Sequence, residues 1–298
     1  MRGDGDGWVT CGLGHPHWGR HGAAGLLLRS ADRPHRVVLM QLRVSWSHHG
    51  GTWGLLGGAR DSHESAVDTA LREAAEEGDI DPGELDVVAA YVDDHDGWSY
   101  STVVADAPSA FTVRPGNAET EELRWVPECE VTALDLHPGF AVTWPTLCTV
   151  PGAPRVVVDA ANVVGSRPDG WWRDRLGAAR RLRDGLGQLA ARGLSADQLA
   201  SAGLSPGHPG NWFADVDMVV EGAATPLANE PLPGVRTVAA PRSGDDQIVT
   251  LVAEHARLPD RPTVVVTADR ALRTRCANAD THAVLVGPSW LHGILDTL

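Results

Sequence analysis

The chain has 298 residues, 43 % of them hydrophobic, and a formal net charge of −14. Its length predicts two domains, and no apolar run approaches the roughly 20 residues that a membrane-spanning helix needs. The amino terminus lacks a signal-peptide pattern, and the four cysteines lie far apart without a CxxC pair, which argues against a zinc ribbon or a disulfide framework. We expect a cytoplasmic protein with free thiols and no membrane partner.

The charge is divided unevenly along the chain. Residues 1–150 contain 23 acidic residues and 10 arginines, which give a net charge of −13. Residues 151–298 contain 16 acidic residues and 15 arginines, which give a net charge of −1. Prolines and a glycine interrupt any helix or strand at 149–154. These features predict two units with separate functions, residues 1–149 and residues 155–298.

Short apolar segments recur along the first half. They predict strands at residues 22–28, 37–42, 87–92, 100–105 and 122–126, polar turns at 30–35 and 93–96, and a helix at 142–148. Between the second and third strands, residues 52–55 lead into a segment with helical spacing. The pattern favours strands packed around one helix.

That segment, from Gly58 to Ile80, carries the strongest pattern in the sequence. Its spacing is G-x5-E-x7-R-E-x-x-E-E, formed by Gly58, Glu64, Arg72, Glu73, Glu76 and Glu77. At typical residue frequencies such a set arises by chance on the order of once in ten million start positions, so we interpret it as functional. Apolar residues between them recur at helical spacing and predict a helix with one buried face: Val67, Ala70, Leu71 and Ala74.

Three glutamates of this segment stand at positions i, i+3 and i+4 of the predicted helix: Glu73, Glu76 and Glu77. Their carboxylates converge on one face, where like charges repel one another unless water or a cation neutralises them. Divalent cations such as Mg²⁺ bind carboxylate oxygens of this kind together with substrate phosphates. A metal site and a solvated acidic face are the two interpretations, and we favour the metal site.

The segment resembles the Nudix box, the signature of hydrolases that split nucleoside diphosphates linked to another group. The resemblance implies a mixed-sheet α/β/α sandwich in which the box forms a loop, a helix and a loop. It assigns Mg²⁺ or Mn²⁺ binding to Glu73, Glu76 and Glu77. It also implies catalytic roles for Arg72, Glu73 and Glu76.

The same resemblance implies roles for the residues around these glutamates. Arg72 would orient a glutamate through a bidentate pair, and Glu64 would support the helix and the metal site. Gly57 and Gly58 would form the turn and contact the substrate. The sequence departs from the usual box at Asp79, where the family has glycine.

Carboxylates outside the box are candidates for a base or an additional metal ligand. The first group precedes or begins the predicted strand at 122–126 and comprises Glu119, Glu121 and Glu122. The second group forms an acidic turn and comprises Asp93, Asp94 and Asp96. The alternative for both groups is a solvated surface.

Histidines and tryptophans of the first half have simpler interpretations. His15, His17 and His21 lie in a segment with Pro and Gly and without a cysteine pair, so we interpret them as structural or loop residues. We interpret four tryptophans as core residues or cleft walls, although one of them could stack on a nucleobase: Trp18, Trp46, Trp53 and Trp98.

The second half alternates strand segments with helical segments. Strands are predicted at residues 155–158, 218–220, 235–239, 263–267 and 284–286, and a helix at 247–256 with Ser243 as its N-cap. This alternation is typical of an α/β fold with a doubly wound parallel sheet. Acidic residues at the strand ends then meet in one cleft, at the edge where such sheets bind ligands.

Polar residues at these strand ends form a second constellation: Asp159, Asn162, Glu221, Asp245, Asp246 and Asp269. The segments VVVDAANVV, SGDDQIV and VVTADRALR resemble the PIN-like nucleases of the NYN branch. The resemblance implies an α/β/α domain whose aspartates hold Mg²⁺ or Mn²⁺ and activate water against an RNA phosphodiester.

That resemblance assigns metal binding to Asp159, to Asp245 or Asp246, and to Asp269. It implies catalytic roles for Asp159 and Asp269. Asn162 would position the site, and Glu221 is an additional candidate. The alternative is an α/β domain whose aspartates cap helices and form turns.

Arginines gather on a predicted helix after Trp171 and Trp172: Arg173, Arg175, Arg180, Arg181 and Arg183. Such a stripe could neutralise phosphates while the tryptophans offer stacking faces, and we assign substrate binding to Arg173 and Arg175. The alternative is a solvated helix face with Asp174 and Asp184 as local partners.

These observations predict a Mg²⁺- or Mn²⁺-dependent pyrophosphohydrolase, acting on a nucleoside diphosphate linked to another group, fused to a PIN-like domain that cleaves RNA. The alternative is a nucleotide-sensing protein whose first domain binds without turnover and controls an RNA-acting domain. The intact box glutamates favour the enzyme, because an unused site would be free to lose them. A nucleotide-type substrate and RNA are the expected partners; the exact nucleotide and a homodimer are left open.

Overall fold

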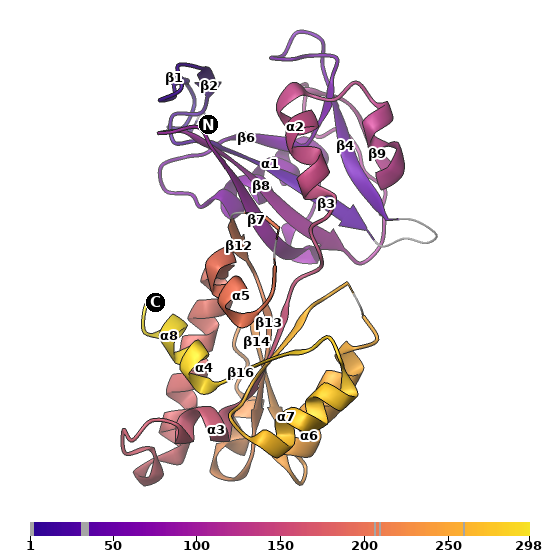
Figure 1. The fold of residues 1–298 in the computed structure, drawn as a ribbon. Helices are drawn as coiled ribbons and strands as arrows, with labels where there is room; N and C mark the ends of the chain where they lie inside the picture. Colours follow the sequence, from indigo (N-terminus) through magenta and orange to yellow (C-terminus); the bar gives the residue numbers. More distant parts are fainter. Residues whose placement is uncertain (1–2, 31–35, 206, 209, 259) are drawn as a thin grey trace. The chain divides into compact units, whose positions relative to one another are not determined.

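A computed structural model describes residues 3–30, 36–205, 207–208, 210–258 and 260–298 (Figure 1). The chain divides into two compact units, Met1–Val150 with Gly207–Gly210, and Pro151–Pro206 with Asn211–Leu298. Most of the predicted turn at 30–35 lies outside the described residues. Within the described ranges, every helix is too short or too polar to cross a membrane.

The N-terminal unit is built around a mixed sheet. Its strands are β1 (Trp8–Thr10), β2 (Pro16–Trp18), β3 (Ala23–Ser30), β4 (Val37–Arg43), β5 (Trp53–Gly54), β6 (Leu56–Ala59), β7 (Asp86–Asp94), β8 (Ser99–Ala107) and β9 (Thr120–Pro127). Strand β3 pairs with β8 in parallel and with β4 and β6 antiparallel. Strand β7 pairs antiparallel with β8, whereas β5 and β9 pair antiparallel with β4. The prediction of a mixed-sheet α/β fold is therefore confirmed.

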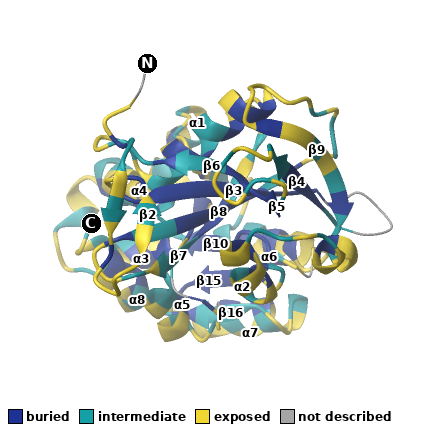
Figure 2. Cartoon of the chain, turned by 90° about the horizontal axis from the view of Figure 1, so that it is seen from above, coloured by how far each residue is buried: buried dark blue, intermediate teal, exposed yellow. Residues whose placement is uncertain are grey.

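Two helices cover opposite faces of this sheet, α1 (Ala66–Gly78) and α2 (Pro138–Leu147) (Figures 1 and 2). Helix α1 packs against β3, β6 and β8, with Ala70 and Ala74 fully buried. Short 3-10 helices follow α1 and β9 at Pro82–Glu84 and Glu128–Ala133. The predicted strands all form, most of them longer than predicted, and α2 begins several residues before the predicted helix at 142–148.

Local hydrogen bonds fix where α1 begins. Ser65 is its N-cap, and the Ser65 hydroxyl accepts from the Asp68 N–H while the Asp68 carboxylate accepts from the Ser65 N–H. This reciprocal capping box satisfies two backbone donors at the helix start. The box glutamates therefore stand on a helix whose register is set by its own sequence.

The end of α1 falls at Gly78, and the next residue has a left-handed backbone. Asp79 has φ 51° and ψ 40°, and its N–H donates to the Ala75 carbonyl at 3.2 Å. Glycine, which the box usually has here, adopts this conformation without the steric cost of a Cβ atom. The residue after the helix, Asp79, thus adopts the left-handed backbone conformation although it is not glycine.

We expect Asp79→Gly to be more stable than Asp79→Ala by about 1 kcal/mol, because a Cβ atom is disfavoured in the left-handed region and alanine cannot compensate through a local hydrogen bond. Urea unfolding of the two variants beside the wild type measures the difference. If Asp79→Gly and Asp79→Ala had equal free energies of unfolding, the backbone at residue 79 could leave the left-handed conformation without cost.

The C-terminal unit is a parallel sheet between helices. Its strands and helices are β10 (Arg155–Asp159), α3 (Ala160–Gly165), α4 (Arg175–Arg192), β11 (Leu194–Ser195), α5 (Ala196–Ala202), β12 (Gly210–Trp212), β13 (Asp215–Val220), β14 (Val235–Ala239), α6 (Gly244–His255), β15 (Thr263–Val266), α7 (Arg270–Ala279), β16 (Val284–Val286) and α8 (Pro288–Leu295). Two 3-10 segments, Trp171–Arg173 and Gly222–Asn229, complete it.

The sheet has the order β14-β13-β10-β15-β16, with all neighbours parallel. Helices α6 and α7 lie on one face, and α4 and α8 on the other (Figure 1). Val157, Val219 and Val265 pack with α6 and α7 in one core cluster. The five predicted strands and the parallel doubly wound arrangement are therefore found, with the switch in strand order between β10 and β15.

Some predictions about single residues are corrected. Trp53 and Trp98 are buried, as core residues should be, but Trp18 and Trp46 are exposed. Ser243 does precede α6, yet its side chain makes no capping hydrogen bond. The Gly244 N–H at the start of α6 instead donates to Glu221 Oε2 at 2.8 Å. A distant carboxylate therefore takes the capping position that the sequence suggested for Ser243.

Candidate functional site

The first candidate site is the box site, formed by Glu64, Arg72, Glu73, Glu76 and Glu77 on and before α1. Arg72 forms a bidentate pair with Glu64. Its Nε donates to Oε1 at 2.7 Å, and its Nη2 donates to Oε2 at 3.0 Å. Arg72 Nη1 also donates to Glu73 Oε1 at 2.7 Å and lies 3.7 Å from Glu76 Oε2. The guanidinium thus links three of the four glutamates, Glu64, Glu73 and Glu76, and fixes their orientation.

The three glutamates of the helix differ in burial. Glu77 is 2 % exposed, and its Oε2 accepts from the Gly57 N–H at 2.9 Å. Burial, opposed by this hydrogen bond, raises the pKa of Glu77 to about 7. Burial also raises the pKa of Glu73, against the lowering effect of Arg72. The Glu76 side chain is 59 % exposed and is the one open to solvent.

Gly57 and Gly58 lie in strand β6, and neither forms the turn that the sequence suggested. A Cβ atom on Gly57 would lie 2.5 Å from the Ala24 carbonyl oxygen, and one on Gly58 would lie 2.4 Å from Glu73 Oε1. The glycines are therefore required for close approach between β6, β3 and α1, and not for a positive φ angle.

We expect Gly58→Ala to lower metal affinity or activity by about 10- to 100-fold, because the added methyl group displaces the Glu73 carboxylate that Arg72 holds. Gly54→Ala is a matched control, since a Cβ atom there meets only His137 Cβ, at 3.6 Å. A metal titration of both variants measures the effect. If Gly58→Ala and Gly54→Ala behaved alike, Glu73 would not need its present position.

The chemistry of this donor set fits a hard divalent cation. Glu73 and Glu77 have carboxylates buried enough to raise their pKa, and a bound cation would compensate the charge that burial disfavours. Of the acids outside the box, Glu119 lies near enough to act on the pKa of Glu73. Glu122 instead pairs with Arg124 at 3.8 Å, and no described contact joins Glu121 to the box site.

Comparison with known proteins identifies this half. The sequence model of the NUDIX domain matches residues 19–145. A protein named "Putative 8-oxo-dGTP diphosphatase 3", from Mycobacterium tuberculosis, is 54 % identical over 159 residues, covering 51 % of this chain and 72 % of that protein. The chain belongs to the Nudix family.

Two further proteins are similar over about half of the chain. A "Nucleoside triphosphate pyrophosphatase/Nudix hydrolase fusion protein" of Bifidobacterium longum is 42 % identical over 146 residues, covering 47 % of this chain and 30 % of that protein. The solved Nudix hydrolase RenU of M. smegmatis is 47 % identical, covers 49 % of this chain and 94 % of its own, and superposes with a TM-score of 0.47. The Nudix resemblance of the N-terminal unit is confirmed, and the PIN-like resemblance stays a prediction.

The second candidate site lies beyond the Nudix domain, at the carboxyl ends of the parallel strands. Asp159 ends β10, and its Oδ2 accepts from Thr267 Oγ1 at 2.9 Å, just after β15. Burial raises the pKa of Asp159, with Asp245 and Glu221 adding to the effect. Burial likewise raises the pKa of Asp245, and Asp269 acts in the same direction. We call Asp159, Glu221, Asp245 and Asp269 the second acidic cluster.

Neighbouring residues separate the two aspartates that the sequence left as alternatives. Asp246 accepts from Arg275 Nη2 at 2.5 Å, whereas Asp245 Oδ2 lies 4.0 Å from Arg275 Nη1. Asp245 is therefore the one grouped with Asp159. Asn162 Oδ1 accepts from the Ala268 N–H at 2.8 Å and so joins the segments after β10 and β15.

Helix capping is also present at this cluster. Asp159 Oδ1 accepts from the Asn162 N–H at 3.1 Å, and Asp269 Oδ1 accepts from the Leu272 N–H at 2.8 Å. Each aspartate thus caps the helix that follows it, and the second oxygen of Asp159 accepts from Thr267. The carboxylate set suits Mg²⁺ or Mn²⁺, which prefer oxygen ligands.

The arginine stripe is only partly available for phosphates. Arg180 and Arg183 both bind Glu230, at 2.7 and 3.1 Å, and Arg183 is 7 % exposed. Arg173 lies in a 3-10 turn before α4, so its predicted helical place is wrong. Arg175 lies 5.5 Å from the centroid of the Trp171 ring, and Arg181 is exposed. The expected local partner Asp184 does accept from Arg183 Nη2, at 3.4 Å, and the long-range partner Glu230 is added to it.

Two cavities of the C-terminal unit, of about 450 and 640 Å³, lie apart from both acidic sites. They open near the beginnings of the strands, beside Arg155, Asp215 and Thr263. None of the predicted site residues lines either cavity. These cavities are therefore separate from the second acidic cluster.

Proposed function

We propose that the Nudix domain hydrolyses the phosphoanhydride of a nucleoside diphosphate linked to another group, with Mg²⁺ or Mn²⁺ bound at the box site. The observation that carries the proposal is that Arg72, held by Glu64, binds Glu73 and lies close to Glu76. Glu77 of the same helix is held by the Gly57 N–H. Carboxylates placed this close together repel one another unless a cation neutralises them. The chain belongs to a family of hydrolases, which supports a hydrolytic role for these residues.

Each residue of the box site has its own role in the proposed reaction. When bound, the cation would neutralise the diphosphate and make a water more acidic. Glu73 and Glu77 would hold it, with Glu77 fixed by the Gly57 N–H. Glu76, the exposed one of the three, would accept a proton from the attacking water. Attack at phosphorus breaks the bond to the bridging oxygen and releases a nucleoside monophosphate and a second phosphorylated product.

The first substrate to consider is 8-oxo-dGTP. The mycobacterial relative, 54 % identical, bears the name of a diphosphatase of that nucleotide. With this substrate the products would be 8-oxo-dGMP and pyrophosphate. Nucleoside diphosphate sugars, dinucleoside polyphosphates and dinucleotide cofactors are the other members of the class.

A panel of these nucleotides with Mg²⁺ or Mn²⁺, read as monophosphate release, tests the proposal. Turnover of 8-oxo-dGTP well above that of dGTP would support the oxidised-nucleotide assignment. Turnover of another member alone would keep the hydrolase and change its substrate. Tight binding of a nucleotide without release of any product would favour the sensing alternative.

We further propose that the C-terminal unit cleaves RNA at the second acidic cluster. Its support is the all-parallel sheet whose order switches between β10 and β15, with Asp159, Asp245 and Asp269 near that switch. Ligands of open α/β sheets bind at such a switch point. Four mutually repelling carboxylates at that place suit metal ions that act on a phosphodiester.

A further inference from the structure

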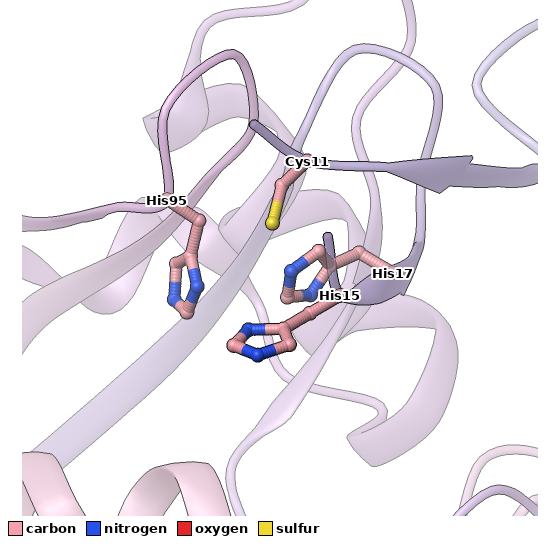
Figure 3. Close-up of side chains that lie close together, drawn as sticks. All are labelled: Cys11, His15, His17 and His95. Atoms are coloured by element: carbon pink, nitrogen blue, oxygen red, sulfur yellow. The ribbon is translucent and has the colours of Figure 1, made fainter. Parts of the chain in front are cut away.

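Four potential metal ligands gather at the amino-terminal hairpin, outside both acidic sites. Cys11, His15, His17 and His95 each offer a ligand atom, and these atoms all lie within 4.8 Å of one another (Figure 3). Three of the residues come from the hairpin of β1 and β2, and His95 comes from the turn between β7 and β8. We call this group the Cys-His cluster.

The hairpin places its ligands by backbone geometry. Val9 pairs with His17 across the two strands, and the Cys11 N–H donates to the His15 carbonyl at 3.0 Å. The Gly12 N–H donates to the Asp96 carbonyl at 2.6 Å, which ties the hairpin loop to the β7–β8 turn. Backbone contacts therefore hold the two segments together at the point where the four side chains meet.

Two ring nitrogens of the cluster lack partners. His17 Nε2 and His95 Nδ1 are buried and have no hydrogen-bond partner among the described residues. A buried polar nitrogen without a partner is costly, so native structures usually provide one. A cation between these nitrogens and the buried Cys11 sulfur would satisfy both of them.

Neighbouring groups orient the two buried imidazoles. His95 Nε2 lies 3.2 Å from Asp93 Oδ2, so the opposite nitrogen, Nδ1, is left for a metal. A carboxylate bound to the far nitrogen is the usual support of a metal-binding histidine. The His17 ring stacks on Trp98 with centroids 4.0 Å apart, and Trp98 is fixed by its bond to the Gly19 carbonyl at 2.8 Å.

We propose that Cys11, His15, His17 and His95 bind one Zn²⁺ ion. One thiolate and three imidazoles are ligands that zinc accepts and that Mg²⁺ and Ca²⁺ do not favour. Four protein ligands form a closed tetrahedral site, which is the structural kind. The ion fastens the hairpin to the β7–β8 turn and so covers Trp98 and Ala23 of the Nudix domain, which pack with Cys11.

Burial and the neighbouring histidines lower the pKa of His17, with burial the larger cause. Three of the four ligands precede residue 19, where the match to the NUDIX model begins.

The test is the zinc content of the full-length chain purified without chelators, measured by mass spectrometry. We expect about one zinc per chain in the wild type and almost none in Cys11→Ser and His95→Ala. Three controls should keep the zinc. They are His21→Ala, whose ring lies near Asp4 and outside the cluster, Glu76→Gln at the box site, and His137→Ala, in a separate group with His48 and His49. Zinc that is lost in Glu76→Gln, or kept in Cys11→Ser, would overturn the proposal.

A second measurement needs no variant to fold. The wild type, stripped with a chelator and titrated with Co²⁺, should develop the visible bands of a tetrahedral site and the near-ultraviolet band of a cobalt–thiolate bond. Zn²⁺ at equal concentration should remove both. An octahedral spectrum, or no thiolate band, would show that Cys11 is not a ligand and would overturn the assignment.

Discussion

Replacing Glu76 by glutamine is expected to lower kcat for metal-dependent nucleotide hydrolysis by about 10²- to 10⁴-fold. Glutamine keeps the size of the side chain but loses the negative charge and the basic oxygen. Because the Glu76 side chain is 59 % exposed, the helix should tolerate the change. Monophosphate release at saturating substrate and metal, beside a circular dichroism spectrum, measures both expectations.

Glu84→Gln is the matched control for this experiment. Glu84 is an exposed glutamate of the same unit, in the 3-10 helix after α1, and makes no described contact with the box site. It should keep the full rate. A Glu76→Gln enzyme within about two-fold of the wild type would remove Glu76 from the reaction and leave Glu119, near Glu73, as the next carboxylate to replace.

Replacing Asp159 by asparagine should lower RNA cleavage by about 10²-fold or more, because one of the carboxylates that would hold a metal at the scissile phosphate is neutralised. The asparagine Oδ1 can still accept from the Asn162 N–H, and its Nδ2 can donate to Thr267 Oγ1, so the cap of α3 should persist. Nucleotide hydrolysis by the Nudix domain should be unchanged. Cleavage of a labelled single-stranded RNA with Mn²⁺, beside the nucleotide assay, separates the two effects.

Asp246→Asn tests the geometry of the same cluster. Its carboxylate is engaged by Arg275, so its loss should affect cleavage far less than the loss of Asp159 or Asp245. A stronger effect of Asp246→Asn would show that the aspartates exchange places when a metal binds. RNA left intact by the folded wild type with Mn²⁺ would contradict the nuclease proposal itself.

The sequence was sufficient where the relevant spacing is local. Glu73, Glu76 and Glu77 share a helix, so their meeting follows from the helical period alone. The bidentate pair of Arg72 and Glu64 is also a local contact, because only a short segment separates the two residues. The positions of the strands in the second half of the chain could likewise be predicted, because short apolar segments alternate there with turn residues.

Features that depend on distant segments could not be predicted. The glycine pair is required by the carbonyl of Ala24 and the carboxylate of Glu73, and the local sequence suggested only a turn. The pairing of Arg183 with Glu230 joins residues 47 positions apart. The histidines of the hairpin are interpreted as loop residues from the Pro and Gly around them and the lack of a cysteine pair. Only the structure brings His95, from a distant turn, close to His15 and His17.

The strand order of the C-terminal unit has a consequence for synthesis on the ribosome. The central strand β10 is bordered by β13 and β15, and the bond between Asp159 and Thr267 spans 108 residues. Strands β3 to β9 and helices α1 and α2 of the Nudix domain all precede Cys148, so they can fold while the rest of the chain is still being made. The second acidic cluster must wait for nearly the last segment. A ribosome stalled before Thr263 would display a folded Nudix domain together with an apolar β10 whose β15 edge is still unpaired. That intermediate is the species most exposed to aggregation and to proteases during synthesis.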